Sequence, residues 1–423
     1  MSKKATAGGK DRFGDLTDDL LGHVLSFLPL EDALQTCVLD TRWRNHWRRT
    51  TTQDFIVGKR SSPLSCERLK QLVKLFIHLR GSSPLDECNI DVCRDDDDEK
   101  GTYRNTELLI AYALECQVRE LLVTVDYFGE GQRKLHKPLI SQHLKTIHLE
   151  WVKLECSALN FSRCPVLEDL KMRRCIIYAH RISSKSLKRL CITGSCCFAE
   201  DVHTRIFAPN LISLQLDGFD GFPPFIEYMP FLVAAYVRLR DTCFDFCRES
   251  DDFGCYDCPV FEGVLNGLTN AVNLEFVSEN GMFSHLWCSE WFPIFDKLKT
   301  LLLNECFMAS DLVCILKHTP ILEVLTLQLG KPKILIRVTD SQETVEQSVV
   351  CAHLEVVNIE CRKVDERIRT ILKILSTCGI PRGKISIKDL FCCSNRFSFQ
   401  KAPRSQLPST TAPVAAVSTI DGT

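Results

Sequence analysis

Three stretches in the middle of the chain share one pattern: LEDLKM at 167–172, LKRLCI at 187–192 and LISLQL at 211–216. Each begins with Leu, carries a second Leu three residues later, and places another large apolar residue two positions further on. The alternation of apolar and polar residues that ends each stretch is typical of a short β-strand with one buried face. Each unit therefore contributes one strand followed by a segment that returns to the start of the next strand.

This pattern recurs along most of the chain, about every 27 residues, which lies in the range of leucine-rich repeats. Its anchors are Leu85, Val118, Leu144, Leu167, Leu187, Leu211, Leu232, Ala271, Leu298, Leu322 and Leu354. We therefore predict an α/β fold in which residues 51–350 form a leucine-rich-repeat solenoid, or horseshoe. Cys93, Cys175 and Cys306 occupy the repeat position where Asn or Cys turns the chain and satisfies backbone groups.

Residues two, four and six positions after an anchor alternate with the buried ones, so they are predicted on the open, concave face. In the central units these positions form a mixed, mildly basic surface with one aromatic residue. We predict that a protein partner binds to Lys171, Arg173, Arg189, Tyr236 and Arg238. The positive charges favour an acidic or phosphorylated partner, although Asp169 and Asp217 oppose them, and an uncharged partner stays open.

The N-terminal region, residues 11–50, predicts three short helices. Thr17 is a suitable N-cap before Asp18 and Asp19, whose charges complement the helix dipole. Apolar residues then recur at helical spacing up to Pro29, and Trp43 and Trp47 lie one turn apart. So many large apolar groups exceed what a unit of this size can bury, which indicates that part of the surface meets a partner.

The same region resembles an F-box over RFGDLTDDLLGHVLSFLPLEDA at 12–33, TCVL at 36–39 and RWRNHW at 42–47. Residues 351–390, which include HLEVVNIECRKVDERIRTILKILSTCG at 353–379, resemble an FBD segment. The chain is thus similar to the plant F-box family that carries leucine-rich repeats and a C-terminal FBD segment. Two departures are Thr17, where the family has Pro, and Asp40-Thr41, where it has Ser-Lys; the second is expected to weaken docking slightly.

This resemblance implies a substrate-recognition subunit that binds a Skp-type adaptor, joins a cullin ubiquitin ligase and presents a target protein held by the repeats. It implies adaptor contacts for Leu16, Leu20, Leu21, Val24, Leu25, Leu28, Pro29, Val38, Leu39, Trp43 and Trp47. The predicted organisation is 1–10 disordered, 11–50 F-box, 51–350 repeats, 351–390 FBD-like and 394–423 disordered tail. The expected location is the nucleus, the cytoplasm or both.

Composition excludes several other classes. The 423 residues are 45% hydrophobic and carry a formal charge of -2, so the chain can build a core and has no large electrostatic attraction for nucleic acid or anionic lipid. No signal peptide or stretch of about 18 apolar residues is present, so a reduced state is expected for the 23 cysteines. Phosphate-loop, nucleophile-elbow, zinc-protease and kinase motifs are missing, and we predict neither enzymatic activity nor a cofactor.

Several alternatives stay open. The chain is either a ligase subunit or a non-catalytic repeat scaffold acting outside a ubiquitin ligase; a hydrolase would need a clustered nucleophile and base, which we do not find. Cys243, Cys247, Cys255 and Cys258 have a looser spacing than a common zinc knuckle, so no metal is assigned, although zinc is not eliminated. The basic and aromatic run 42–49 is interpreted as protein packing, the acidic run 95–99 as a solvated loop, and a small ligand on the concave face is undecided.

Overall fold

The computed structural model describes most of the chain between residues 16 and 389. The described residues are 16–28, 30–38, 43–57, 66–92, 99–125, 135, 137–155, 158–199, 203–239, 262–278, 292–304, 307, 309–330, 352–362 and 364–389. The chain divides into two compact units, 1–390 and 391–423, and every described residue belongs to the first. The termini predicted to be disordered, 1–10 and 394–423, lie outside the described residues, as does most of the acidic run.

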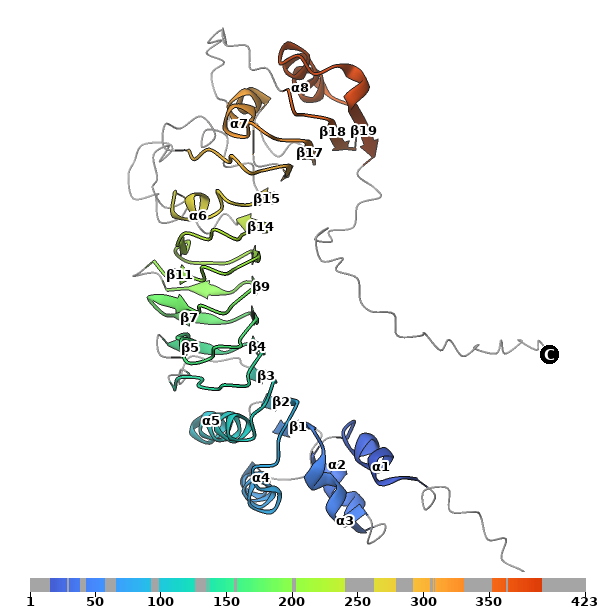
Figure 1. Ribbon diagram of the computed structural model, residues 1–423, viewed down its shortest axis with the longest axis vertical. Coiled ribbons are helices and arrows are strands. Elements are labelled where there is room, and N and C mark those ends of the chain that lie inside the picture. The colour runs from blue at the N-terminus through green and yellow to red at the C-terminus, as the bar shows by residue number, and fades with distance from the viewer. Residues whose placement is uncertain are drawn as a thin grey trace, which may run out of the picture. The chain divides into compact units, whose positions relative to one another are not determined.

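Short helices form the N-terminal region of this unit (Figure 1). They are α1 (Asp18–Leu25), α2 (Leu30–Gln35), η1 (Thr36–Val38), α3 (Trp43–His46) and η2 (Trp47–Arg49). The start of α1 follows from local chemistry, because the Thr17 side chain accepts a hydrogen bond from the Leu20 backbone N–H at 3.4 Å. The acidic first turn, Asp18 and Asp19, adds a favourable interaction with the helix dipole.

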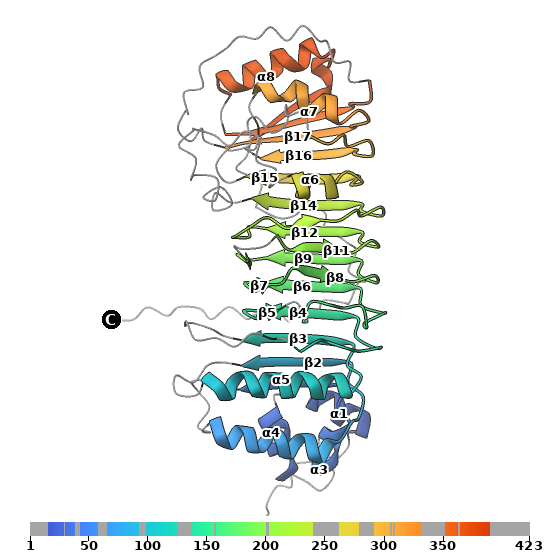
Figure 2. The same ribbon diagram turned by 90° about the vertical axis from the view of Figure 1, so that its left-hand side faces the viewer.

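A 13-stranded sheet, parallel throughout, follows these helices (Figures 1 and 2). Its strands, in spatial order, are β1 (Thr52–Val57), β2 (Glu87–Val92), β3 (Glu120–Val125), β4 (Thr146–Glu150), β6 (Asp169–Arg173), β9 (Arg189–Thr193), β12 (Ser213–Asp217), β14 (Ala234–Leu239), β15 (Asn273–Ser278), β16 (Thr300–Asn304), β17 (Val324–Leu329), β18 (Val356–Cys361) and β19 (Ile385–Asp389). The order begins at β1 and ends at β19, so the described sheet is not a closed barrel.

The predicted repeat anchors position these strands. Each of the eleven main-sheet strands between β1 and β19 begins two residues after one of the eleven anchors, and every anchor side chain is at most 2% exposed. The prediction of one strand for each unit is therefore confirmed. The sequence pattern did not predict β1 and β19, which extend the sheet at its two ends. The FBD-like segment contributes β18 and β19 to the same sheet.

The return segments build a second layer on one face of the main sheet, where Figures 1 and 2 place α5, α6 and α7. Its helices are α4 (Cys66–Arg80), α5 (Glu99–Glu115), α6 (Glu262–Gly267), η5 (Ala309–Asp311), α7 (Leu312–His318), α8 (Glu366–Thr377) and η6 (Arg382–Lys384). Two three-stranded sheets join them: β5 (Lys153–Glu155), β7 (Ile176–Tyr178) and β10 (Cys197–Phe198), and β8 (Arg181–Ser183), β11 (Arg205–Phe207) and β13 (Phe225–Ile226). The spacing of apolar residues over 65–80 predicts an amphipathic helix, which α4 confirms, whereas α5 was not predicted.

Left-handed residues redirect the chain after four consecutive strands of the main sheet, one residue after each of three strands and two, Gly194 and Ser195, after β9. Trp151, Arg174, Gly194 and Gly218, which follow β4, β6, β9 and β12, have φ values of 59°, 53°, 71° and 63°. Side chains rarely adopt this conformation, but here the following strand supplies a partner for the turning residue. The Trp151 N–H donates to the Arg173 carbonyl oxygen at 3.0 Å. Each of these return segments therefore begins with the same change of backbone direction.

Candidate functional site

Four of the N-terminal residues assigned to adaptor contact lie in the core. Leu21 and Leu25 are at most 1% exposed, and Trp43 and Trp47 are 7% and 3% exposed. The Trp47 ring packs on Phe76 of α4, with 5.2 Å between ring centroids. These side chains therefore join the helices to one another and to the first repeat, and they are poorly accessible to a partner in this conformation.

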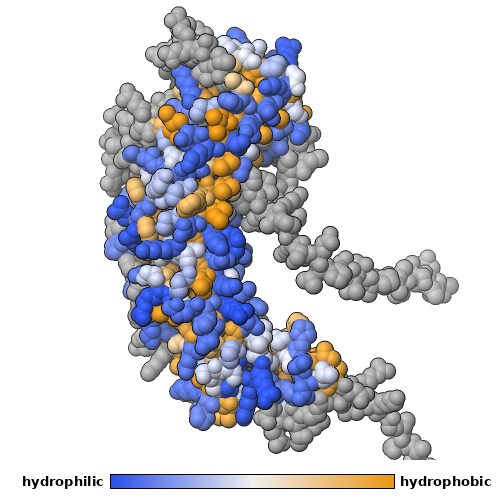
Figure 3. Space-filling model, viewed as in Figure 1, coloured by the Kyte–Doolittle hydropathy of each residue, from blue (hydrophilic) through white to orange (hydrophobic). Residues whose placement is uncertain are grey.

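A second set of apolar side chains from the same helices faces solvent. Leu20 and Val24 on α1 are 49% and 40% exposed, and Val38 at the end of η1 is 86% exposed. Phe27, which the sequence analysis did not select, is 71% exposed. Leu20, Val24 and Phe27 are spaced four and three residues apart, and this spacing was already visible in the sequence as one helical face. Figure 3 shows apolar side chains over this part of the surface.

The remaining adaptor-contact residues fall into two groups. Leu16 and Leu28 are partly buried and pack against the core. Pro29 and Leu39 lie outside the described residues, as do Asp40 and Thr41. Of the predicted set, Leu20, Val24 and Val38 are therefore the described residues that face solvent.

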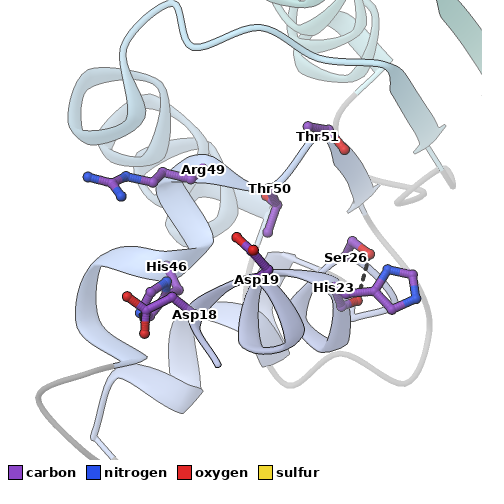
Figure 4. Close-up of a pocket in the computed structure, with 9 residues that line it drawn as sticks. Asp18, Asp19, His23, Ser26, His46, Arg49, Thr50 and Thr51 are labelled. Carbon is purple, nitrogen blue, oxygen red and sulfur yellow. Dashed lines mark hydrogen bonds and ion pairs between the residues drawn. The ribbon is translucent and has the colours of Figure 1, made fainter. Parts of the chain in front are cut away.

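A polar pocket of about 290 Å³ lies on another side of α1, between this helix and the end of η2 (Figure 4). Its lining is Asp18, Asp19, Gly22, His23, Ser26, His46, Arg49, Thr50 and Thr51. The His46 Nε2 lies 3.4 Å from an Asp18 carboxylate oxygen, and this contact connects α3 to the start of α1. The lining side chains include carboxylates and an arginine, so the pocket differs in kind from the exposed apolar face.

The buried Arg80, at the end of α4, connects the N-terminal helices to the first repeats. Its guanidinium donates to the backbone oxygens of Thr50 at 2.9 Å, Ser83 at 2.7 Å and Pro84 at 3.2 Å, and to the Tyr112 hydroxyl at 3.1 Å. Only the planar fork of arginine reaches so many acceptors at once. The guanidinium thereby fixes the end of η2 against α4 and α5.

The sheet face opposite the second layer carries the residues predicted to bind a partner. Adjacent strands place Glu150 opposite Arg173, Asp169 opposite Arg189 and Asp217 opposite Arg238. The three pairs are ion pairs: Arg173–Glu150 at 3.3 Å, Arg238–Asp217 at 3.4 Å, and Arg189 with both carboxylate oxygens of Asp169. The positive charge expected here is therefore largely compensated within the sheet itself.

Lys171 and Tyr236 occupy the middle row of this face. Lys171 is exposed and lies opposite His148, whose pKa is lowered by burial and by the nearby Lys171 and Arg173. Tyr236 is only 7% exposed, and burial followed by the Asp217 charge raises its pKa to about 12. The five predicted residues thus share one face, but Tyr236 presents little of its ring to a partner.

The first three strands give the same face a different charge. Their outward positions include Asp54, Glu87, Asp91 and Glu120, and Glu87 lies directly opposite Glu120. Burial raises the pKa of Glu87, and the Glu120 and Asp54 carboxylates raise it further. A partner that follows the whole face meets carboxylates on β1–β3 and compensated pairs beyond them.

The cysteines serve the repeats. The Cys175 thiol donates to the Leu149 carbonyl oxygen at 3.3 Å, as expected for its repeat position; Cys93 and Cys306 lie outside the described residues. Cys314 takes part in a disulfide, so the expectation of reduced thiols does not hold at that position.

The four cysteines considered for zinc, Cys243, Cys247, Cys255 and Cys258, lie outside the described residues. Across the described ranges, His, Cys, Asp and Glu form no group of three that could hold a metal ion.

Within the part of the chain that the structure describes, no helix is both long enough and apolar enough to cross a membrane.

Several known proteins with similar sequences come from plants. The chain is 28% identical over 393 residues to the meiotic F-box protein MOF of Oryza sativa subsp. japonica, with 83% of this chain and 80% of that protein covered. It is 27% identical over 339 residues to an F-box/LRR-repeat protein of Arabidopsis thaliana, covering 76% and 74%. The chain is a homologue of plant F-box/LRR-repeat proteins. No family model matches it.

The names of these F-box/LRR-repeat homologues agree with the segments recognised in the sequence. A putative F-box/FBD/LRR-repeat protein of Arabidopsis thaliana is 30% identical over 257 residues, which cover 54% of this chain and 59% of that protein. F-box, leucine-rich repeat and FBD all occur among the names. The predicted resemblance is therefore confirmed.

Proposed function

We propose that this chain is the substrate-recognition subunit of a Skp–cullin–F-box ubiquitin ligase. The observation that carries the proposal is the apolar face formed by Leu20 and Val24 of α1 and by Phe27, two residues after this helix. These side chains are 40–71% exposed although the helix is packed on its other side. Side chains of this kind cluster at protein interfaces. The face belongs to a short helical region joined to a repeat sheet, as expected for an adaptor-binding module fused to a target-binding module.

The N-terminal helices act in this proposal as a three-helix F-box. The exposed Leu20, Val24, Phe27 and Val38 contact the Skp-type adaptor. Leu21, Leu25, Trp43 and Trp47 position those side chains from the core. Leu16, Leu28, Pro29 and Leu39 remain in the proposed contact set.

The repeats hold the target in a horseshoe whose concave face includes Lys171, Arg173, Arg189, Tyr236 and Arg238. Since the three arginines already pair with carboxylates, an acidic target would have to replace Glu150, Asp169 or Asp217. The three carboxylates are only 15–28% exposed, and Asp169 binds Arg189 with both oxygens, so such an exchange carries a cost that the target contacts must offset. The chain itself makes no bond; it raises the effective concentration of a target lysine near the ubiquitin-carrying enzyme.

Reconstitution with a plant Skp-type adaptor and a cullin tests this function. The full chain should elute with both proteins in size-exclusion chromatography, whereas Leu20→Asp with Phe27→Asp should leave it as a separate peak. Ile294→Asp, which changes a 61% exposed residue in the repeat region, is the matched control. A complex that forms equally well with the double variant, or never forms with the wild-type chain, would leave a scaffold outside the ligase as the better explanation.

A further inference from the structure

A second concentration of exposed apolar side chains lies far from α1 in the sequence. Ile212, Phe225, Tyr228, Phe231 and Val233 are 43%, 39%, 68%, 61% and 42% exposed. We call these five residues the edge patch. Four of them lie between the start of β13 and the residue just before β14. The fifth, Ile212, is the residue just before β12. None of them is on the sheet face proposed to hold the target.

The edge patch interrupts a row of charged residues at the start of the main strands. In this row Lys188 pairs with Glu168 at 2.6 Å and Lys299 pairs with Glu323 at 2.7 Å. Between those pairs the neighbouring positions are Ile212, Val233 and Val272, linked by backbone hydrogen bonds in that order. Figure 3 shows an apolar stripe between hydrophilic regions on the central part of this surface. The exposed apolar side chains are thus bordered by charged ones, as in a protein interface with a polar rim.

Two arginines border the patch on the second layer. The Arg181 guanidinium lies 4.6 Å from the centroid of Phe207, and that of Arg205 lies 5.0 Å from Phe225. Both reach one carboxylate, Glu227, at 3.1 Å and 3.9 Å. The two arginine side chains are 49% and 60% exposed, so among the described residues two accessible cations share one anion, which leaves a net positive charge there.

The packing of α6 fixes one member of the patch, Phe225. A Cβ atom added at Gly263 would lie 2.6 Å from a Phe225 ring carbon, and one at Gly267 would lie 2.3 Å from an Ile226 side-chain carbon. These glycines therefore allow the α6 backbone to rest directly on β13. One side of the Phe225 ring is thereby fixed before any partner binds, which lowers the entropic cost of association.

We propose that the edge patch, with Arg181 and Arg205, binds a partner protein through a segment that carries acidic residues beside a large apolar side chain. Aromatic residues and arginine dominate the binding energy of protein interfaces. The net positive charge selects an acidic segment over a basic one. This inference does not depend on the adaptor, because the patch and the exposed face of α1 belong to different regions of the chain.

Selection from a phage library of random peptides, with the full chain as bait, tests the proposal. Selected peptides should combine Asp or Glu with Phe, Leu or Trp. Fluorescence anisotropy of a selected peptide should show binding weakened at least about tenfold by Tyr228→Ser with Phe231→Ser. Arg181→Glu with Arg205→Glu should have a similar effect. These residues are exposed, so the fold should persist, which circular dichroism checks.

Arg369→Glu, at a 70% exposed arginine of α8, is the control and should leave the affinity of the peptide within about twofold, since that residue lies outside the patch. Basic or neutral peptides, or affinity that survives both double variants, would overturn the proposal. Light scattering that shows a dimer lost in the Tyr228→Ser and Phe231→Ser variant would overturn it in favour of a second copy of this chain. Adaptor binding should be unchanged in every variant, so a failure here is separate from a failure of the ligase assignment.

Discussion

The N-terminal helices and the repeat sheet use apolar residues differently. In the repeats all eleven anchors are buried, and Arg173, Arg189 and Arg238 each pair with a carboxylate of a neighbouring strand. In the helices Leu21 and Leu25 are buried, whereas Leu20 and Val24 of the same helix are 49% and 40% exposed. A leucine at an anchor position therefore indicates a buried side chain in a repeat, whereas a leucine in the short helix α1 is either buried or exposed.

The largest expected effect lies in the repeat core. Leu214 of β12 is fully buried, and Leu214→Ala should lower the free energy of unfolding by about 3 kcal/mol through lost contacts and a cavity. Urea unfolding followed by circular dichroism measures the change. Ile212→Ala, two residues away and exposed, should change stability by less than about 0.5 kcal/mol. Equal effects would contradict the assignment of buried and exposed positions.

The helical region should separate stability from binding. Leu25→Ala removes a buried side chain and should lower the free energy of unfolding by about 2–3 kcal/mol. Leu20→Ala should leave the melting temperature nearly unchanged and weaken adaptor binding by about 1–2 kcal/mol. Thermal unfolding and a binding titration on the same preparations distinguish the two. If Leu20→Ala destabilised the chain as much as Leu25→Ala, both faces of α1 would belong to the core.

The contact between the two regions is sensitive to one side chain. Arg80→Lys keeps the charge but cannot reach the carbonyl oxygens of Thr50, Ser83 and Pro84 together, so we expect a loss of about 2 kcal/mol. Hydrogen exchange should accelerate in α4 and around Thr50. Arg119→Lys, at an arginine that is 64% exposed, is the control and should have no measurable effect. Unchanged exchange in Arg80→Lys would show that apolar packing alone joins the regions.

The smallest effect concerns the acidic start of the sheet. Because burial and neighbouring carboxylates raise the pKa of Glu87, the folded state favours its protonated form, and stability is lost as the pH rises through that pKa. Glu87→Gln should therefore stabilise the chain by about 0.5 kcal/mol at about pH 7 and by less at about pH 3.5. Glu323→Gln, which removes the partner of Lys299, should give no gain at either pH. If the stability gained by Glu87→Gln increased toward low pH, the pKa of Glu87 would not be raised in the folded state.

The repeat pattern predicted the sheet because each anchor reports a side chain that must be buried in every unit. The same pattern could not predict β1 or β19, since the first strand buries Gln53 where later strands have an apolar residue. It placed Arg173, Arg189 and Arg238 on one face correctly but did not give their ion pairs, which depend on register between strands. The spacing of Leu20, Val24 and Phe27 is visible in the sequence, yet only packing distinguishes the 71% exposure of Phe27, two residues after α1, from the buried Leu25.

Isothermal titration calorimetry of the full chain with a purified plant Skp-type adaptor tests the central claim most directly. We expect saturable one-to-one binding. The double change Leu20→Asp with Val24→Asp should weaken it at least about 100-fold, as expected for the loss of two interface contacts. Ile294→Asp should bind like the wild-type chain. Binding of the double variant at wild-type affinity, with its melting temperature unchanged, would contradict the assignment of this face to the adaptor.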